Sequence, residues 1–226
     1  MALSALWRKA LSLIRLNGYS VRSMVLQFPL RGRWTARLEV NELEENLVSK
    51  PCVLEEDNGS RLICNVVSQR SGSDVVYVAG GSSGLRNEAS AKSFKDATVK
   101  AILSDTLGNI QLSKTSPPGV MNTRLPFWTR LRSYVSRALD DLGDSVKANW
   151  RVLDDGSVWF GAESYPKLDD FSATVMDMNG ADETLLVAPD DIRLRPGFTW
   201  RGHEVGEVEH AFNRNEPLRT TIWLSP

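Results

Sequence analysis

The stretch Trp150–Gly161, which reads W-R-V-L-D-D-G-S-V-W-F-G, decides how the chain is divided. On both sides of the turn Asp154-Asp155-Gly156, apolar side chains alternate with their neighbours, as they do in strands with one buried face. Glycine accepts the positive φ angle of a tight turn, so an Asp-Gly pair between two alternating runs predicts a β-hairpin. Strong helical patterns precede this hairpin and strand-like runs follow it. We interpret it as the join between a helical connector and a second β-domain.

The part of the chain before the connector consists of short strand-like runs separated by turns. The run V-R-S-M-V-L-Q-F begins at Val21 and stops at Pro29, which has no N–H group to donate to a sheet. Apolar and polar residues alternate again over residues 34–40. Short strands with turn signals about 8–12 residues apart are typical of a small antiparallel barrel or sandwich.

A second hairpin is predicted around Asn58-Gly59. Cys52 and Cys64 lie six residues on either side of Asn58, so we expect them to face each other across the ladder. A disulfide there is possible geometrically but is not expected in a reducing cytosol. Two cysteines cannot make a zinc site, and no other cofactor motif is present.

Two apolar stripes with helical spacing lie between the β-rich parts. The first, which precedes Gly108, comprises Val99, Ile102, Leu103 and Leu107. The second, which we expect to end at Gly143, comprises Trp128, Leu131, Tyr134, Val135, Ala138, Leu139 and Leu142. Both are interpreted as amphipathic helices that face the core. After the central hairpin, Asn179-Gly180 marks one more predicted hairpin.

These patterns predict a mainly β fold with a helical connector (α+β) and two small antiparallel β-barrels. The expected parts are a basic amphipathic N-terminal arm, a first barrel, a linker with two connector helices, and a second barrel, over residues 1–17, 18–82, 83–147 and 148–226. Strands could exchange between the two barrels. At 226 residues the chain has room for two such small domains.

Composition excludes several classes of protein. A net charge of −1 and a pI near 6.2 argue against a dedicated nucleic-acid binder. No apolar run approaches the ~20 residues that span a bilayer, so we expect no membrane insertion. The N-terminus lacks the features of a signal peptide, which predicts synthesis in the cytoplasm.

The N-terminal segment is unusually basic. Residues 3–16 carry an apolar stripe that includes Trp7, with Arg8, Lys9 and Arg15 beside it, and Asn17-Gly18 would stop the expected helix. Such a helix can lie on a membrane surface, on the body of its own chain or on a neighbouring subunit.

Charge is distributed unevenly along the chain. Residues 1–38 contain seven bases and no acid, whereas residues 154–191 contain ten acids and one base. Two interpretations are open: solvated faces of opposite sign, or complementary surfaces that guide assembly.

One stretch has the form of a catalytic motif. Residues 80–84 read G-G-S-S-G, which would make Ser82 a serine-hydrolase nucleophile with His203 or His210 as its base. That enzyme needs a strand–elbow–helix unit, and the neighbouring strands look like hairpins, so a flexible linker is the other reading. The two histidines are seven residues apart, which on a strand places them on opposite faces and argues against a shared metal site. A third alternative is a monomeric adaptor that binds a peptide or glycan through exposed aromatics such as Trp159 and Trp200.

Four stretches resemble the baseplate hub of tailed bacteriophages, the family of the late control protein D and of hub proteins in related secretion systems. They are T-V-K-A-I-L (98–103), W-T-R-L-R-S-Y-V (128–135), the central hairpin (150–161), and L-R-P-G-F-T-W-R-G-H-E-V-G-E-V-E-H (194–210) leading into L-R-T-T-I-W-L (218–224). The resemblance covers roughly residues 20–226, and its motifs are patterns of turns and alternation, without catalytic signatures.

The resemblance implies a non-enzymatic structural protein of the virion tail, assembled in the host cytoplasm. Members of the family contain two tail-tube-like barrels and trimerise into a pseudo-hexameric ring, which joins the tail tube to the spike or tip and lines the DNA channel. The expected partners are other tail proteins, with DNA passing through without specific binding.

Two sets of residues follow from this hub hypothesis. The candidate assembly surface is Trp7, Arg8, Lys9, Arg15, Trp159 and Trp200. The candidate lumen acids, which would repel passing phosphates, are Asp169, Asp170, Asp182 and Glu183. We further expect that a chain lacking residues 1–16 would fold but fail to join its neighbours.

Overall fold

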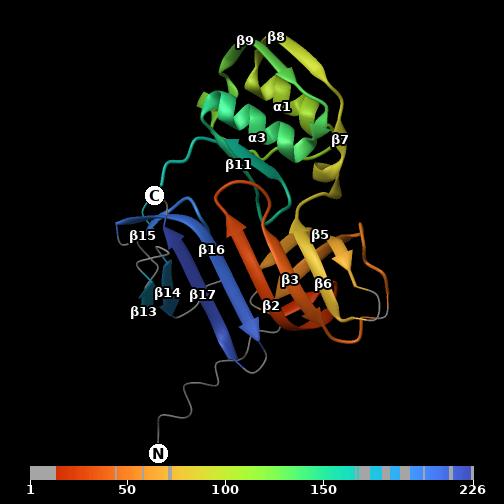
Figure 1. Ribbon diagram of the computed structural model, residues 1–226, viewed down its shortest axis with the longest axis vertical. Helices are drawn as coiled ribbons and strands as arrows, with labels where there is room; N and C mark the ends of the chain where they lie inside the picture. The colour runs from red at the N-terminus through yellow and green to blue at the C-terminus, as the bar shows by residue number, and fades with distance from the viewer. Residues whose placement is uncertain are drawn as a thin grey trace, which may run out of the picture.

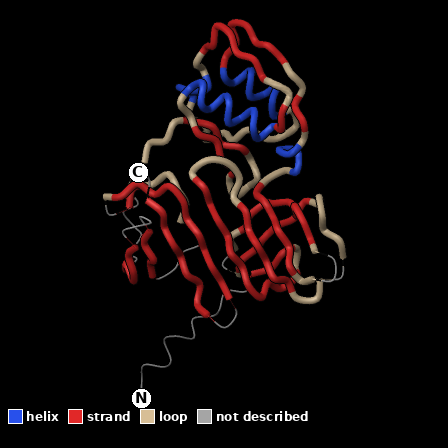
Figure 2. The backbone as a smooth tube through the Cα atoms, viewed as in Figure 1, coloured by secondary structure: helices blue, strands red, loops and turns tan. Residues whose placement is uncertain are grey.

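The computed structural model describes residues 14–43, 45–57, 59–70, 73–165, 167, 174–179, 184–188, 194–200, 202–213 and 216–224. The molecule has two parts (Figure 1): a large β-sheet body, and a smaller part above it that contains the helices. Figure 2 shows that strands make up nearly all of the body and that helices are confined to the upper part. The expectation of a mainly β fold with a helical connector is confirmed.

The first six strands close into an antiparallel barrel. They are β1 (Ile14–Leu16), β2 (Tyr19–Pro29), β3 (Thr35–Val40), β4 (Pro51–Glu56), β5 (Arg61–Gln69) and β6 (Val75–Gly80). Their order is β1-β4-β5-β6-β3-β2, and the pairing of β1 with β2 closes the ring. Cys52 is paired with Cys64 across β4 and β5, as the sequence predicted.

Strand β1 corrects the expected N-terminal helix. Ile14 and Leu16 are buried on one side of a strand, and Arg15 between them is exposed. Asn17-Gly18, which we took for a helix stop, has positive φ at both residues and turns the chain from β1 into β2. The rest of the expected helix, residues 3–13, lies outside the described residues.

The second half of the chain continues the sheet of the first. Its strands are β11 (Asn149–Val152), β12 (Val158–Gly161), β13 (Thr174–Asn179), β14 (Thr184–Ala188), β15 (Thr199–Trp200), β16 (His203–Asn213) and β17 (Glu216–Leu224). The predicted hairpin at Asn179-Gly180 is confirmed by the pairing of β13 with β14. From β2 the sheet runs on through β16, β17, β14 and β13, so main-chain pairing of β2 with β16 joins the two halves. Closure of these later strands into a second barrel remains a prediction.

The register explains where the core lies. One row across five strands runs Val78, Ala36, Leu26, His210 and Thr220, and every member is buried. The row one step along each strand has the opposite orientation, because side chains alternate between the faces of a sheet. The buried face of the barrel therefore continues onto β16 and β17.

The upper part is an insert of strands and helices. It comprises the 3₁₀ turn η1 (Ser83–Arg86), β7 (Glu88–Ala89), β8 (Lys92–Thr98), α1 (Val99–Leu107), α2 (Pro118–Met121), β9 (Arg124–Arg130), β10 (Ser133–Tyr134) and α3 (Val135–Val146). Helix α1 is as predicted: the Thr98 hydroxyl caps its start and Gly108 ends it. Strand β8 pairs with β9, and β7 pairs with β10.

Helix α3 is shorter at its start and longer at its end than its sequence pattern suggested. Trp128 lies on β9 opposite Phe94, while Leu131 and Tyr134 are exposed before the helix begins. The helix passes through Gly143 and ends at Val146, and Lys147 after it has a left-handed conformation. A side chain at Gly143 would lie 2.6 Å from the Ala148 carbonyl oxygen, so this glycine serves close packing and does not end the helix.

The central hairpin is confirmed, and it holds the two parts together. Trp150 pairs with Phe160, and Val152 with Val158, in a two-stranded sheet of their own. The Ile63 N–H of the barrel donates to the Asp154 carbonyl at 2.8 Å. On the other side, the Val158 carbonyl accepts a hydrogen bond of 2.7 Å from the Ser113 N–H of the insert.

Candidate functional site

The outer face of the continuous sheet is a broad, open surface across β6, β3, β2, β16 and β17 (Figure 1). One row of facing residues on it runs Tyr77, Arg37, Val25, Ala211 and Arg219. Each of them is exposed or half-buried, in contrast to the buried row beside them. This face is therefore polar and accessible on both sides of the β2–β16 junction.

Two acids occupy the part of this face that belongs to β16. Glu209 is paired with Gln27 and accepts a hydrogen bond from its Nε2 at 2.9 Å. Glu207 lies two residues away on the same face, between Pro29 and Trp223. Partial burial, and then repulsion from Glu209, raises the pKa of the Glu207 carboxyl above its usual range. The two carboxylates place negative charge beside the junction of the two halves.

Sequence reasoning missed these two acids, although a signal for them was present. In E-V-G-E-V-E-H, Glu207 and Glu209 alternate with Val208 and His210. Period-two alternation puts both acids on the face opposite the core. The acids that were chosen instead, Asp169, Asp170, Asp182 and Glu183, all lie outside the described residues.

The structure does not bring together the three predicted assembly residues that it describes, Arg15, Trp159 and Trp200. Trp200 is 1% exposed, which corrects its assignment to a surface, because β15 turns this ring into the core beside β16. Trp159 is also buried, under the guanidinium of Arg151, which lies 4.1 Å from the ring. Arg15 is exposed on β1 and lies 3.8 Å from Asp57. Trp7, Arg8 and Lys9 lie outside the described residues.

Arg151 links the hairpin to the segment that follows it. Its guanidinium donates to Glu163, a carboxylate that is 8% exposed. Burial raises the pKa of Glu163 and outweighs the attraction of Arg151, which acts in the other direction. The exposed aromatics that an adaptor would need at Trp159 and Trp200 are thus both covered.

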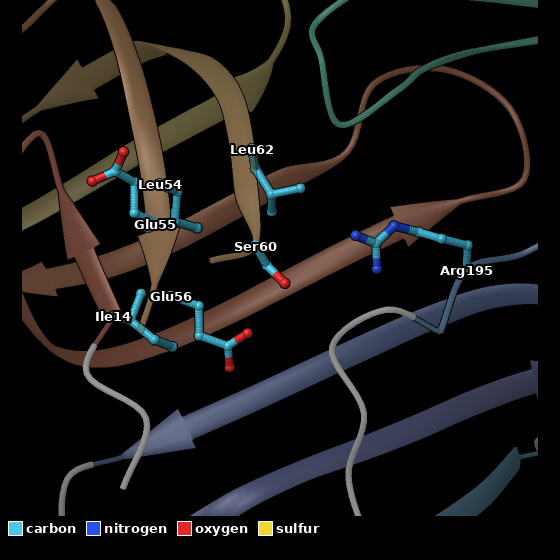
Figure 3. Close-up of a pocket in the computed structure, with 7 residues that line it drawn as sticks. All are labelled: Ile14, Leu54, Glu55, Glu56, Ser60, Leu62 and Arg195. Carbon is cyan, nitrogen blue, oxygen red and sulfur yellow. The ribbon is translucent and has the colours of Figure 1, made fainter. Parts of the chain in front are cut away.

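Arg195 fixes the second half against the barrel. Its guanidinium donates to both carboxylate oxygens of Asp154 at 3.1 Å and lies 3.8 Å from the Phe28 ring. Figure 3 shows its side chain directed toward Ser60 and Leu62 across a small cavity. The cavity has a volume of about 20 Å³, which is room for a single water and not for a substrate.

Asp140 on α3 joins three elements. Its carboxylate accepts from Arg31 Nε in the β2–β3 loop at 3.0 Å and from Trp150 Nε1 on β11 at 2.8 Å. Arg31 also pairs with Asp144 at 2.6 Å. The insert, the hairpin and the barrel are therefore held in one orientation by a shared carboxylate.

Ser82 is not placed as a hydrolase nucleophile. Its hydroxyl accepts from the Gly84 N–H at 3.0 Å and caps the short turn η1, so no helix follows it as an elbow requires. The adjacent cleft, of about 420 Å³, has no histidine among its lining residues. His210 lies in the core, where its ring nitrogens contact Thr220 Oγ1 at 2.9 Å and the Leu194 carbonyl at 3.3 Å.

The described part of the chain contains no cluster of three or more histidine, cysteine, aspartate or glutamate side chains that could hold a metal ion. Among the same residues, none of the helices has the length and apolar character needed to cross a membrane.

No protein-family model and no curated protein matches the sequence. Solved structures do match. A tail protein from Neisseria meningitidis superposes with a TM-score of 0.65 at 12% identity, over 95% of this chain and 96% of that one. The 43 kDa tail protein of prophage MuSo2 from Shewanella oneidensis gives 0.65 at 10% identity, over 95% and 97%. The chain has the fold of these phage tail proteins.

A third structure extends the likeness beyond phages. It is an Escherichia coli component of the type VI secretion system, described as structurally similar to the bacteriophage T4 tail proteins gp27 and gp5. The TM-score is 0.62 at 12% identity, over 97% of this chain and 75% of that one. Because each match covers at least 95% of this chain, the shared fold includes the insert and the second half as well as the barrel.

Proposed function

We propose that this chain is a structural hub of a phage or phage-derived tail, and that it acts by assembly and not by catalysis. In this proposal three copies form a pseudo-hexameric ring in the virion tail, between the tail tube and the spike or tip. The observation that carries it is the continuous sheet, in which the barrel and the second half pair through β2 and β16. The tail-protein fold across 95% of the chain supports the same role.

We further propose that the outer face of this sheet lines the channel. A surface that lets DNA pass should repel phosphates, because cationic side chains would bind them with release of counterions. Glu207 and Glu209 supply negative charge on β16 at the middle of this face, where Gln27 holds Glu209 in place. The same face carries Arg37, which is paired with Glu39 at 3.0 Å, and Arg219 on β17, so the proposed repulsion is local to the two glutamates. The earlier acids at 169, 170, 182 and 183 stay a separate prediction.

The ring is tested by native mass spectrometry of the purified chain and by counting its copies in isolated tails. A trimer in solution, or a monomer in solution with three copies per tail, agrees with the proposal. A monomer that is absent from tail particles would remove the structural role. Assembly in the host cytoplasm is checked by breaking cells open before the phage lyses them and looking for assembled tails in the extract.

The channel is tested by reversing the charge of both glutamates, Glu207→Lys with Glu209→Lys. Tails built from this double variant should assemble but retain DNA, and the retention should weaken as the salt concentration rises. The matched control is Glu55→Lys with Glu56→Lys on β4, a strand outside the five-stranded face. Equal DNA release by both double variants would contradict a channel at this face.

A further inference from the structure

Two thiols inside the barrel face each other, and the proposed tail function uses neither. Cys52 on β4 and Cys64 on β5 are direct partners in the ladder. Both are free thiols, and each is 1% exposed. Leu54 and Leu62, the next pair on the same face, are also buried.

The main-chain hydrogen bonds define the kind of pair. Glu56 N–H donates to the Ser60 carbonyl at 3.0 Å, whereas the Ile63 N–H donates out of this ladder to Asp154. Bonding alternates along an antiparallel ladder, so Cys52 and Cys64 form a hydrogen-bonded pair, whose Cα atoms are typically about 5.5 Å apart. That separation is inside the range of about 4.4–6.8 Å that disulfides require.

The thiols are close, but they are not already arranged as a bridge. Cys52 Sγ accepts from Asn17 Nδ2 at 3.4 Å and contacts the Lys50 carbonyl at 3.6 Å. The Cβ atoms of facing residues are typically about 4.5–5.5 Å apart, compared with about 3.5–4.5 Å in a disulfide. Bridging must therefore rotate the side chains and draw the strands together, and the strain makes the bond easier to reduce.

Each thiol is 1% exposed, so a small oxidant reaches the pair only when the strands open locally, and a neighbouring cleft is the place from which it would approach. Cys64 lines the cleft of about 420 Å³ beside Ser82, with Pro51 and Asn65 among its other lining residues. Oxidised glutathione is a disulfide of two tripeptides, and a cleft of this volume falls within the range of about 300–1,000 Å³ that is typical of ligand sites. Cys52 lies directly across the ladder, where it can resolve a mixed disulfide formed on Cys64.

We propose that Cys52 and Cys64 are a reversible redox pair that exchanges with small-molecule disulfides such as oxidised glutathione. The Cys64 thiolate attacks one sulfur of the oxidant, which forms a mixed disulfide and releases one glutathione thiolate. The Cys52 thiolate then attacks the Cys64 sulfur and releases the second. Two electrons pass to glutathione, and the two thiol protons are taken up by the released thiolates or by solvent.

The oxidising conditions invoked here rest on the proposed function, whereas the thiol chemistry itself does not. A chain made in a reducing cytoplasm and carried outside in a particle would meet oxidising conditions only after release. The bridge would then join β4 to β5 within the closed barrel.

The rate has a predictable pH dependence. Burial raises the pKa of both thiols, that of Cys64 to about 12. Because the thiolate is the attacking species, oxidation of the folded protein should accelerate by about tenfold per pH unit between pH 7 and 9.

The test uses the full-length folded protein in buffers of oxidised and reduced glutathione, followed by alkylation in denaturant and peptide mass spectrometry. The expected product joins the peptides of Cys52 and Cys64 with loss of two hydrogens, and millimolar reduced glutathione reopens it. The matched variants Cys52→Ala and Cys64→Ala should yield no bridge; Cys52→Ala should stop at the glutathione adduct of Cys64.

Two results would overturn the proposal. One is a folded protein whose two thiols both remain free for alkylation after oxidation at pH 9. The other is a bridge that forms only when urea unfolds the chain, which would show that the native barrel prevents it. Both readouts use the isolated chain, so they are independent of whether it assembles into tails.

Discussion

Single residues determine how closely the layers of this molecule approach. Gly80 at the end of β6 lies under the indole ring of Trp34, where a Cβ atom would be 2.3 Å from Nε1. Within the described part of the chain, that nitrogen is a buried donor without a hydrogen-bond partner. The ring packs over a bare backbone here, while the Gly80 N–H donates to the Trp34 carbonyl at 2.9 Å and the Gly80 carbonyl accepts from Arg33 at 2.8 Å.

Replacing Gly80 with alanine should destabilise the protein by about 1–3 kcal/mol, because the added methyl overpacks the site against a rigid ring. The matched control is Gly119→Ala in α2, where nothing lies within 4 Å of the added carbon. Urea unfolding followed by tryptophan fluorescence measures both. Equal midpoints for the two variants would mean that Trp34 moves aside without cost.

Secondary-structure elements are joined here by shared polar groups as well as by apolar contacts. Asp140 serves the loop before β3 and the start of β11 at once. The carboxylate of its neighbour Asp141 pairs with Arg137, one helical turn away on the same helix. The two aspartates are adjacent in sequence, but Asp140 contacts two other elements whereas the Asp141 carboxylate pairs with a residue of its own helix.

Asp140→Ala should cost about 1–3 kcal/mol, since it leaves the buried indole N–H of Trp150 without its acceptor and removes one of the two carboxylates that Arg31 contacts. Asp141→Ala should cost only a few tenths of a kcal/mol, as is typical for exposed pairs of this spacing. Differential scanning calorimetry of both variants checks the contrast. Similar losses would show that the insert is held by apolar packing alone.

At the scale of elements, the sequence predicted what depends on local chemistry. The hairpins at Asp154-Asp155-Gly156 and around Asn58 follow from turn residues between alternating runs. The prediction of one helix from Trp128 to Leu142 was wrong in its first part, because Trp128 is on a strand and only the later residues are helical. A run of apolar residues carries both periods when a strand leads directly into a helix, and spacing alone cannot separate them.

The whole molecule depends on pairings between distant segments, which no local pattern could reveal. The pairing of β1 with β4 and the continuation of the sheet from β2 to β16 join residues far apart in sequence. The same limit applies to the candidate site. The alternation around Glu207 and Glu209 can be seen in the sequence, but their position beside Gln27 depends on the register between β2 and β16, which the sequence does not show. Burial of Trp200 was likewise decided by the strand pairing of β15 with β16.

Closure of the barrel changes the expectation for N-terminal deletions. Removing residues 1–16 would delete β1, with its buried Ile14 and Leu16, and leave β4 and β2 without the strand between them. We expect that deletion to lower the unfolding midpoint strongly, whereas removal of residues 1–13 keeps all six barrel strands. Circular dichroism melts compare the two, and equal stability would mean that β1 is dispensable.

The junction of β2 with β16 also has a mechanical consequence. Seven residue pairs join these strands side by side, from Pro29 with Glu207 to Ser23 with Asn213. A force along the strands loads the hydrogen bonds of all these pairs at once, in shear. A force across the strands would break the pairs one at a time. The chain should therefore resist tension along this direction far better than tension across it, which gives the molecule a strong axis and a weak one.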